Sequence, residues 1–419
     1  MCDGKFNRAL RWAIGLAIVA AAALEPASAQ AFREPEGGAL PPYAQKIDLE
    51  RTEPAIRQIE GAVGNGLPSI MLTGYWPPTN EMIRRFSTDP VQNPQGWIGG
   101  DWEGRGYNVL AFFPEFPSGL GKGEGDFEVD YQDTSDDFWL ITAAVNPVAI
   151  ITFGRAYANN WWELEWRNRN LSSWYDDYES PYQPTPAPPD GTESVDHIRY
   201  AALPMEAIAD AVNDAAIGLD AFVDNTGDSG RYLCEYIGYH ASWFHDLHAD
   251  PGVLFQALSA GHVHVGSAID LDDAIAATEI TVRTLIDYLG APLVTNRRHL
   301  YAAEGGAITF DLDPGIAHAN RDYLLCAGLS GTEPGTLLPG GLATIPINRD
   351  WFTNYVLARL NGQVFAHFAG TLDPAGRGTA TLNAPSLAGW TGRTIYFAFG
   401  LSTPQWDYAS NAVELRFVP

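Results

Sequence analysis

Short apolar runs separated by longer polar or amphipathic stretches occupy the first two thirds of the chain. Such runs lie at 70–73, 107–113 and 148–153, and each is followed directly by a glycine or a proline. Brief apolar runs that end at a chain-breaking residue are typical of buried strands in a parallel sheet. The pattern therefore predicts three strands in this part of the chain.

Apolar residues at helical spacing alternate with these runs. They predict helices over 55–63, 204–222, 233–247 and 271–289. Strands that alternate with helices indicate an α/β domain, which we place at 67–290. The expected fold is a mostly parallel sheet sandwiched by helices.

The pattern changes after residue 290. Short alternating runs, divided by turns rich in glycine and proline, predict a small all-β sandwich domain at 305–419. A linker is expected at 291–304, and an N-terminal arm at 31–66. The proline-rich stretch 178–192 is predicted to be a loop.

The first thirty residues have the pattern of a signal peptide. Three basic residues precede an apolar run at 12–24, which is too short to span a bilayer comfortably, and Ala27-Ser28-Ala29 fits a cleavage site. We therefore expect residues 1–30 to be removed and the mature protein to be secreted or periplasmic. No membrane span is expected in the mature chain.

The charge of the chain limits the classes of molecule that it is expected to bind. Its 419 residues include 51 acidic and 25 basic side chains, giving a formal net charge of −26. An acidic surface repels nucleic acid and anionic lipid, so the expected partners are neutral or basic small molecules and peptides. The sequence leaves the oligomeric state open.

One cysteine has the surroundings of a nucleophile. Cys234 follows a glycine turn at the start of a helical run, where unpaired backbone N–H groups favour a thiolate. His262 and His264 share one face of a later strand, and Glu163 and Glu165 share a face in the same way. These residues make a carboxylate–imidazole–thiol triad possible, but they do not choose within either pair.

Three segments resemble the pyroglutamyl peptidase I (pyrrolidone-carboxylate peptidase) family of cysteine peptidases. Residues 228–235 are similar to the family's motif around the nucleophile, and 261–265 to its Gly-Phe-Ile-His-Val motif. Gly154, Glu165 and Asn170 keep the family's Gly-x(10)-Glu-x(4)-Asn spacing. The resemblance covers roughly residues 68–290.

The resemblance implies roles for three residues. Cys234 would be the nucleophile, His264 the general acid and base, and Glu165 the residue that orients the histidine. The implied reaction removes pyroglutamate from peptides with a blocked N-terminus, and it uses no cofactor or metal. The chain departs from the family's motifs at several positions, among them Asn159, Trp166 and Glu235.

Other interpretations remain open at this stage. The protein could be an inactive secreted binding or scaffold protein, or a thiol amidase of other specificity. Metal-dependent hydrolysis is a third possibility, because His245 and His248 share a helix face. By position, Tyr75 and Trp76 are expected near the substrate pocket, and Cys326 is expected to pack within a strand.

Overall fold

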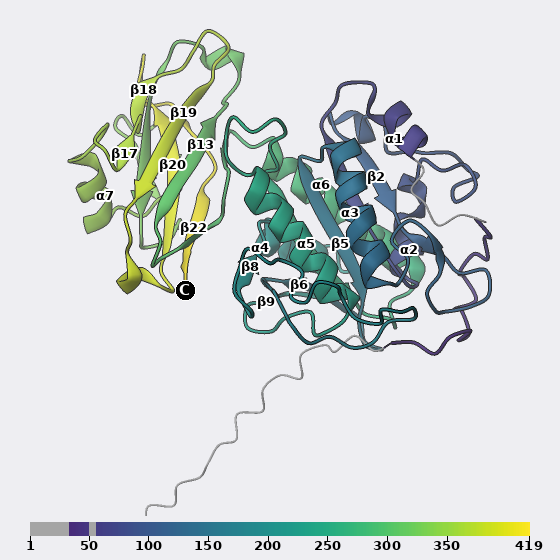
Figure 1. The fold of residues 1–419 in the computed structure, drawn as a ribbon. Coiled ribbons are helices and arrows are strands. Elements are labelled where there is room, and N and C mark those ends of the chain that lie inside the picture. Colours follow the sequence, from purple (N-terminus) through teal and green to yellow (C-terminus); the bar gives the residue numbers. More distant parts are fainter. Residues whose placement is uncertain (1–32, 50–55) are drawn as a thin grey trace, which may run out of the picture.

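The computed structural model describes residues 33–49 and 56–419. The predicted signal peptide at 1–30 lies outside the described residues. The chain forms an α/β part followed by a β-rich part, which lie side by side (Figure 1). None of the helices within the described ranges combines the length and the apolar character needed to cross a membrane.

A six-stranded sheet forms the centre of the α/β part, with the order β2-β1-β5-β10-β6-β9. Its strands are β1 (Ser69–Thr73), β2 (Asn108–Phe112), β5 (Ala149–Arg155), β6 (Trp161–Glu165), β9 (Asp220–Asp224) and β10 (Ser259–Val265). The first four strands in the sheet are mutually parallel, whereas β6 pairs antiparallel to β10 and parallel to β9. The structure therefore confirms a mixed α/β fold in which parallel pairing dominates, and the three strands predicted from apolar runs are present.

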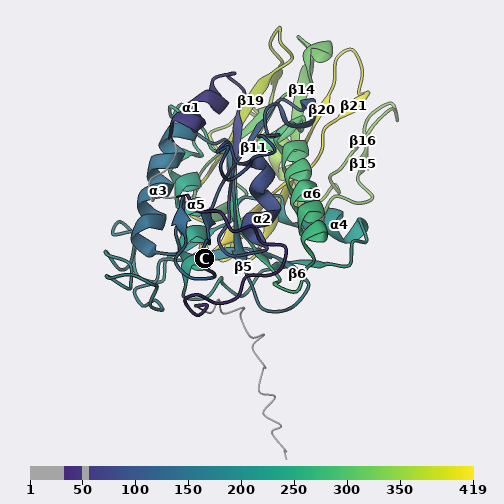
Figure 2. The same cartoon turned by 90° about the vertical axis from the view of Figure 1, so that its right-hand side faces the viewer.

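Helices cover both faces of this sheet (Figure 2). They are α1 (Ile56–Val63), α2 (Thr79–Ile83), α3 (Tyr131–Val145), α4 (Met205–Asp214), α5 (Leu233–His248) and α6 (Leu271–Leu289). Strand residues alternate between two apolar clusters, as the pleat requires: Ile70 packs with α2, α4 and α6, and Met71 with α1, α3 and α5. The helices predicted at 55–63, 233–247 and 271–289 are confirmed.

The helix predicted over 204–222 is too long. Helix α4 ends at Asp214, and the chain then turns and enters β9. Ala216 and Gly218 have φ angles of 52° and 81°, which no α-helix accommodates. The apolar residues beyond this turn pair with β6 instead of continuing the helix.

Two further sheets make up the β-rich part. One has the order β11-β13-β19-β17 and the other β12-β22-β20-β14-β18, with β21 paired to β20. The strands are β11 (Leu293–Thr295), β12 (His299–Tyr301), β13 (Gly306–Leu312), β14 (Asp322–Gly328), β17 (Phe365–Ala366), β18 (Ala369–Thr371), β19 (Gly378–Ala384), β20 (Thr394–Leu401), β21 (Tyr408–Ala409) and β22 (Val413–Val418). Side chains of both sheets share one apolar core with α7 (Trp351–Leu357). The segment predicted as a linker, 291–304, contributes one strand to each sheet.

Short ribbons complete the structure. They are β3 (Pro114–Glu115) with β4 (Glu124–Gly125), β7 (Arg167–Arg169) with β8 (Ile198–Tyr200), and β15 (Thr336–Leu337) with β16 (Thr344–Ile345). The predicted loop at 178–192 contains no helix or strand.

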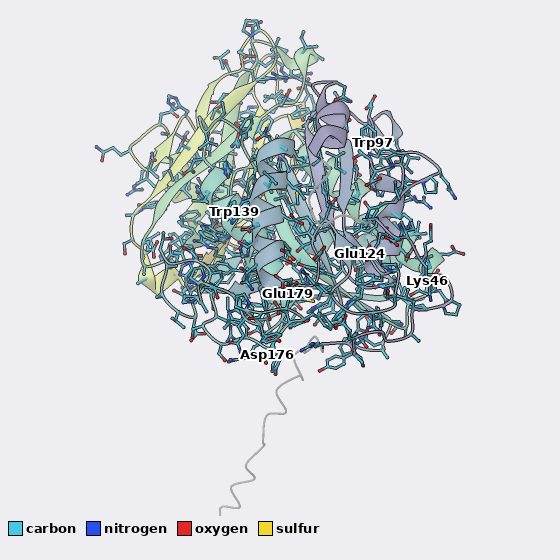
Figure 3. All side chains as sticks on the ribbon, turned by 45° about the vertical axis from the view of Figure 1, so that its right-hand side comes forward. Lys46, Trp97, Glu124, Trp139, Asp176 and Glu179 are labelled. Atoms are coloured by element: carbon cyan, nitrogen blue, oxygen red, sulfur yellow. The ribbon has the colours of Figure 1, made fainter. Side chains whose placement is uncertain are left out.

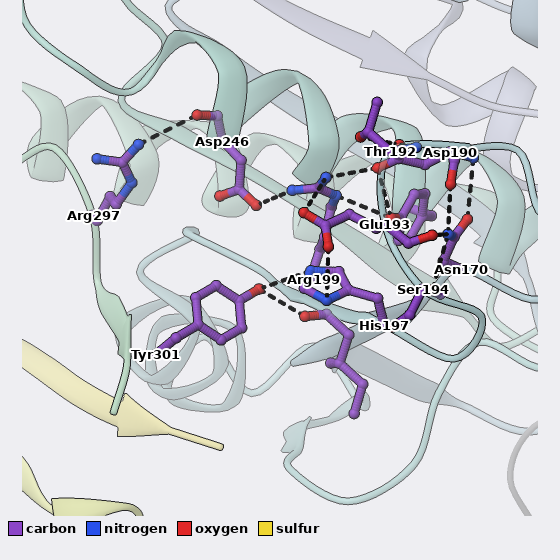
Figure 4. A network of polar contacts seen from close by, with 12 residues as sticks. Asn170, Asp190, Thr192, Glu193, Ser194, His197, Arg199, Asp246, Arg297 and Tyr301 are labelled. Carbon is purple, nitrogen blue, oxygen red and sulfur yellow. Dashed lines mark hydrogen bonds and ion pairs between the residues drawn. The ribbon is translucent and has the colours of Figure 1, made fainter. Parts of the chain in front are cut away.

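A polar network joins α5, the loop before β8 and the start of the β-rich part (Figure 4). Arg199 pairs with Asp190 at 2.7 Å and with Asp246 of α5 at 2.6 Å. Arg297 donates to the Asp246 carbonyl, and Tyr301 to the carbonyl of Ile198. Burial raises the pKa of Asp246, but contacts with His245, His299 and Arg199 hold it below its usual range. The network thus fixes the position of α5 against the loop before β8 and against the start of the β-rich part.

Candidate active site

Cys234 lies in the first turn of α5, near the carboxyl ends of β5 and β10. Gly230 precedes this turn with φ 89°, a conformation that favours glycine. Cys234 is 6% exposed and has no disulfide partner. The first N–H groups of a helix have no partner within it, so the thiol lies beside partial positive charge.

His264 contacts Glu165 more closely than its direct cross-strand neighbour. In the pairing of β10 with β6, Glu163 stands opposite His264 and Glu165 stands opposite His262. Nevertheless, His264 Nδ1 lies 2.7 Å from Glu165 Oε1 and 3.9 Å from Glu163 Oε2. The diagonal contact selects one histidine–glutamate pair from the four that the sequence allowed.

The thiol lies beside both histidines. The Cys234 sulfur and a ring nitrogen of each of His262 and His264 all lie within 4.8 Å of one another. Gly154 of β5 makes the space for this cluster: a Cβ at that position would lie 2.5 Å from Cys234 Sγ and 2.8 Å from His262 Nε2. The structure therefore brings together the three side chains predicted from the sequence, Glu165, His264 and Cys234.

His262 has a partner of its own on β5. Its Nδ1 lies 2.8 Å from Thr152 Oγ1, and this hydroxyl donates to the carbonyl of Gly261 at 3.3 Å. Since the hydroxyl proton is used there, Nδ1 donates to Thr152 and Nε2 carries the lone pair. Among the described residues, Nε2 of His262 and Nε2 of His264 have no hydrogen-bond partner.

The two imidazoles have opposite electrostatic surroundings. Burial lowers the pKa of His264, but Cys234 and Glu165 outweigh it and hold the pKa well above its usual range. Burial and the neighbouring His264 hold the pKa of His262 well below its usual range. One imidazole is therefore placed to carry a proton beside the thiol while the other stays neutral.

Burial raises the pKa of both glutamates on β6. Burial raises the pKa of Glu165, and the hydrogen bond to His264 lowers it in part. Burial and the charge of Glu165 raise the pKa of Glu163 to about 7. Glu165 is the carboxylate that accepts a hydrogen bond from the imidazole, and this contact favours its charged form.

Aromatic side chains pack beside the thiol. Trp76 stacks on Tyr232 at 6.2 Å between ring centroids and meets Tyr178 edge-on at 6.3 Å. Tyr75 is buried and hydrogen-bonded through its hydroxyl to Thr134 at 3.0 Å. We refer to Trp76, Tyr178 and Tyr232 as the aromatic cluster.

Acidic side chains surround the loops on the same edge of the sheet. Figure 3 shows Asp176 and Glu179 beyond the lower end of α3. Lys122 pairs with Glu128 at 2.9 Å, with Asp133 at 3.0 Å and with Glu179. Because carboxylates hold this lysine, the edge favours neutral or basic ligands over acidic ones.

The departures from the family motifs have structural explanations. The buried Glu235 carboxylate accepts from the backbone N–H groups of Ser229 and Arg169, so it braces the turn before α5 and points away from the thiol. Trp166 packs under Arg416 of the β-rich part, with the guanidinium 4.9 Å from its ring. Asn159 Oδ1 accepts from the N–H of Trp161 at the start of β6.

Asn170, the last residue of the Gly-x(10)-Glu-x(4)-Asn spacing, has a structural role. Its side-chain nitrogen donates to the carbonyl of Asp190 at 2.8 Å, and its oxygen accepts from the N–H of the same residue. Asn170 thus fixes the long loop before β8 and does not contact the thiol.

The predicted metal alternative on α5 has no cluster to support it. Nε2 of buried His245 contacts the carbonyl of Asn296, and Nδ1 of half-buried His248 contacts that of Phe255. Within the part of the chain that the structure describes, the sets of three ligands close enough to share an ion are Cys234 with both strand histidines, and Glu163 with Glu165 and His264.

Sequence reasoning missed Thr152 and the specific purpose of Gly154. Thr152 lies in an apolar run and gives no signal of its polar role. In the sequence, only the spacing of a motif pointed to Gly154. In the structure, its lack of a side chain lets the Cys234 sulfur and the His262 ring lie close together. Both roles depend on the register of β5 against β10, which pairs Thr152 with His262 and Gly154 with His264.

Comparison with known proteins gives a limited likeness. No protein-family model and no curated protein matches the sequence. Similar solved structures include pyrrolidone carboxyl peptidase from Thermococcus litoralis, with 18% identity and a TM-score of 0.38 over 53% of this chain and 95% of that chain. Pyroglutamyl peptidase I from Bacillus amyloliquefaciens has 17% identity and a TM-score of 0.38 over 52% and 95%. At this sequence identity and TM-score, the likeness does not identify the activity. The proposed function therefore rests on the geometry of the side chains around Cys234.

Proposed function

We propose that this protein is a cysteine peptidase that releases pyroglutamate from the N-terminus of peptides. The observation that carries the proposal is the buried His264, which contacts Glu165 at 2.7 Å through one ring nitrogen and lies beside the Cys234 sulfur. A nucleophile beside a base that a third group orients is the arrangement for covalent acyl transfer. The motif resemblance supplies the pyroglutamyl specificity.

In the proposed reaction, the Cys234 thiolate attacks the carbonyl carbon of the pyroglutamyl residue. His264 gives its proton to the departing peptide amine, and an acyl-enzyme remains on the sulfur. His264 then takes a proton from water, which attacks the acyl carbon and releases pyroglutamate. Backbone N–H groups of the first turn of α5 stabilise the oxyanion, at about 3 kcal/mol for each donor.

The substrate proposal fits the surroundings of the thiol. A pyroglutamyl residue carries no ammonium charge, so it can enter an apolar site without the large cost of burying an unpaired ion. The acidic edge accepts peptides with neutral or basic side chains beyond the cleaved bond.

We extend the proposal to the location and organisation of the chain. The basic and apolar pattern at 1–30 supports export to the periplasm or the medium. The two sheets with one shared core support a β-sandwich domain at 305–419, appended to a peptidase domain at 67–290. The proposed junction of these domains lies before residue 293, because β11 and β12 already belong to the two sheets.

The direct test uses a pyroglutamyl-coumarin amide with the full chain. We expect fluorescence release that stops on thiol alkylation and is absent from Cys234→Ala. An alanyl-coumarin amide, whose amine is free, serves as the control substrate and should be cleaved far more slowly. Activity that survives Cys234→Ala would refute the mechanism, whereas cleavage of other blocked peptides alone would refute only the substrate.

A further inference from the structure

His262 has no task in the proposed reaction, although it lies in the same buried cluster. It is fully buried, and its Nε2 lone pair has no hydrogen-bond partner among the described residues. An unpaired buried nitrogen normally costs stability, so its retention next to a thiol needs an explanation. A phenyl ring would fill a similar volume without this cost.

The two histidines are held as metal-ligating histidines usually are. His264 directs Nδ1 to the Glu165 carboxylate, and His262 directs Nδ1 to the Thr152 hydroxyl. Ligating histidines typically donate one ring N–H to such a partner, which fixes the tautomer and leaves the other nitrogen for the ion. In each of these two rings, Nε2 is the nitrogen that has no hydrogen-bond partner among the described residues, and the sulfur lies within reach of both rings.

We propose that Cys234, His262 and His264 form a binding site for zinc or a similar borderline-soft divalent cation. Thiolate and imidazole are the ligands that such ions prefer, and three protein ligands leave a fourth position for water. Tetrahedral coordination places ligand atoms about 3.5 Å apart, so the three atoms need to converge by little more than about 1 Å. Because Gly154 has no side chain, the Cys234 sulfur and the His262 ring both lie directly over its Cα, where a Cβ would be 2.5 Å from the sulfur and 2.8 Å from His262 Nε2.

The other possible cluster is less suited to an ion. Glu163, Glu165 and His264 are also near one another, but Glu165 and His264 are already bonded to each other at 2.7 Å. An ion there would have to break the contact that orients the imidazole. The cluster around the thiol needs no such rearrangement.

Metal binding would inactivate the thiol of Cys234 as a nucleophile. The ion takes the sulfur lone pair and displaces to solvent the proton that the thiol and His264 share, so neither group can act on a substrate. This inhibitory consequence rests on the proposed function, whereas binding itself does not. The site would then act as a reversible zinc-dependent switch on the peptidase.

The test is a titration of the full chain with Co²⁺, followed by displacement with Zn²⁺. We expect one ion for each chain and a near-ultraviolet absorption band from sulfur-to-cobalt charge transfer. Cys234→Ser should remove that band, and His262→Phe should weaken affinity at least about 10-fold. The matched control is His248→Gln at the end of α5, outside the cluster, which should bind as the parent does.

A second variant guards against misfolding of the first. Gly154→Ala keeps all three ligands but puts a methyl group between the sulfur and His262, and it should weaken binding as well. Parental affinity in both His262→Phe and Gly154→Ala would overturn the site, as would loss of binding in His248→Gln. Binding without any pyroglutamyl hydrolysis by the metal-free protein would refute the proposed function and leave the metal site standing.

Discussion

Cys234 in the α/β part and Cys326 in the β-rich part are the two cysteines of the described chain, and neither forms a disulfide. Cys234 lies at a helix start beside two imidazoles. Cys326 lies within β14 against apolar side chains, and burial raises its pKa to about 12. Its expected place in a strand is confirmed. The difference teaches that a thiol becomes a candidate nucleophile through its neighbours, since burial alone keeps it neutral.

The same contrast extends to acidic side chains. The α/β part buries several carboxylates, among them Glu165, Asp137 and Glu235. Among the described residues from 293 onward, no aspartate or glutamate reaches that degree of burial. A buried carboxylate lowers stability unless it is paired. The polar site therefore lowers the stability of the α/β part and not that of the β-rich part.

Removing each thiol in turn gives the largest expected difference. Cys234→Ala should lower kcat/KM for the pyroglutamyl-coumarin amide by about 10⁴-fold or more, because the acyl-enzyme cannot form. Cys326→Ala should stay within about 2-fold of the parent, since its side chain only packs. Equal losses in the two variants would remove the distinction between the two regions.

Glu165→Gln should have the next largest effect. The amide cannot stabilise the imidazolium, so we expect kcat to fall by about 10²-fold. Glu163→Gln is the matched control on the same strand face, and its effect should be below about 5-fold because its carboxylate lies 3.9 Å from the ring. Steady-state kinetics on both variants will show which glutamate orients His264. A larger loss of kcat in Glu163→Gln would assign the orienting role to Glu163.

Alkylation rates should separate the two thiols more modestly. At neutral pH, iodoacetamide should label Cys234 at least about 10-fold faster than Cys326, whose raised pKa keeps it protonated. Peptide mapping by mass spectrometry measures both rates in one sample. His264→Ala should slow labelling of Cys234 only, and slowing of both would point to a global change in the fold.

The last prediction concerns the pH dependence of stability and leaves activity aside. Burial raises the pKa of Asp137 to about 8, well above its value of about 4 in an unfolded chain. The stability that its protonated form contributes is complete below about pH 4 and is lost as the pH rises through 8. Asp137→Asn should therefore reduce the loss of unfolding free energy between pH 5 and pH 8 by about 3–4 kcal/mol. Denaturant unfolding at the two pH values measures this, and an unchanged loss would contradict the assignment.

The sequence by itself determined the local elements and the residue types of the site. Apolar runs located β1, β2 and β5, and helical spacing located α5 and α6, because these patterns reflect which side of each element is buried. The order of the motif segments also brought Cys234, His264 and Glu165 forward as candidates. Periodicity failed over 204–222, where a turn with positive φ angles separates a helix from a strand that carries on the same apolar spacing.

Only the tertiary structure decided which members of each pair meet. His262 and His264 share a face, as do Glu163 and Glu165, because strand side chains alternate with a period of two. The choice came from the antiparallel register of β6 against β10 and from the diagonal reach of Glu165 to His264. The roles of Thr152, Gly154 and Trp166 likewise depend on contacts between segments far apart in the chain, which no local pattern encodes.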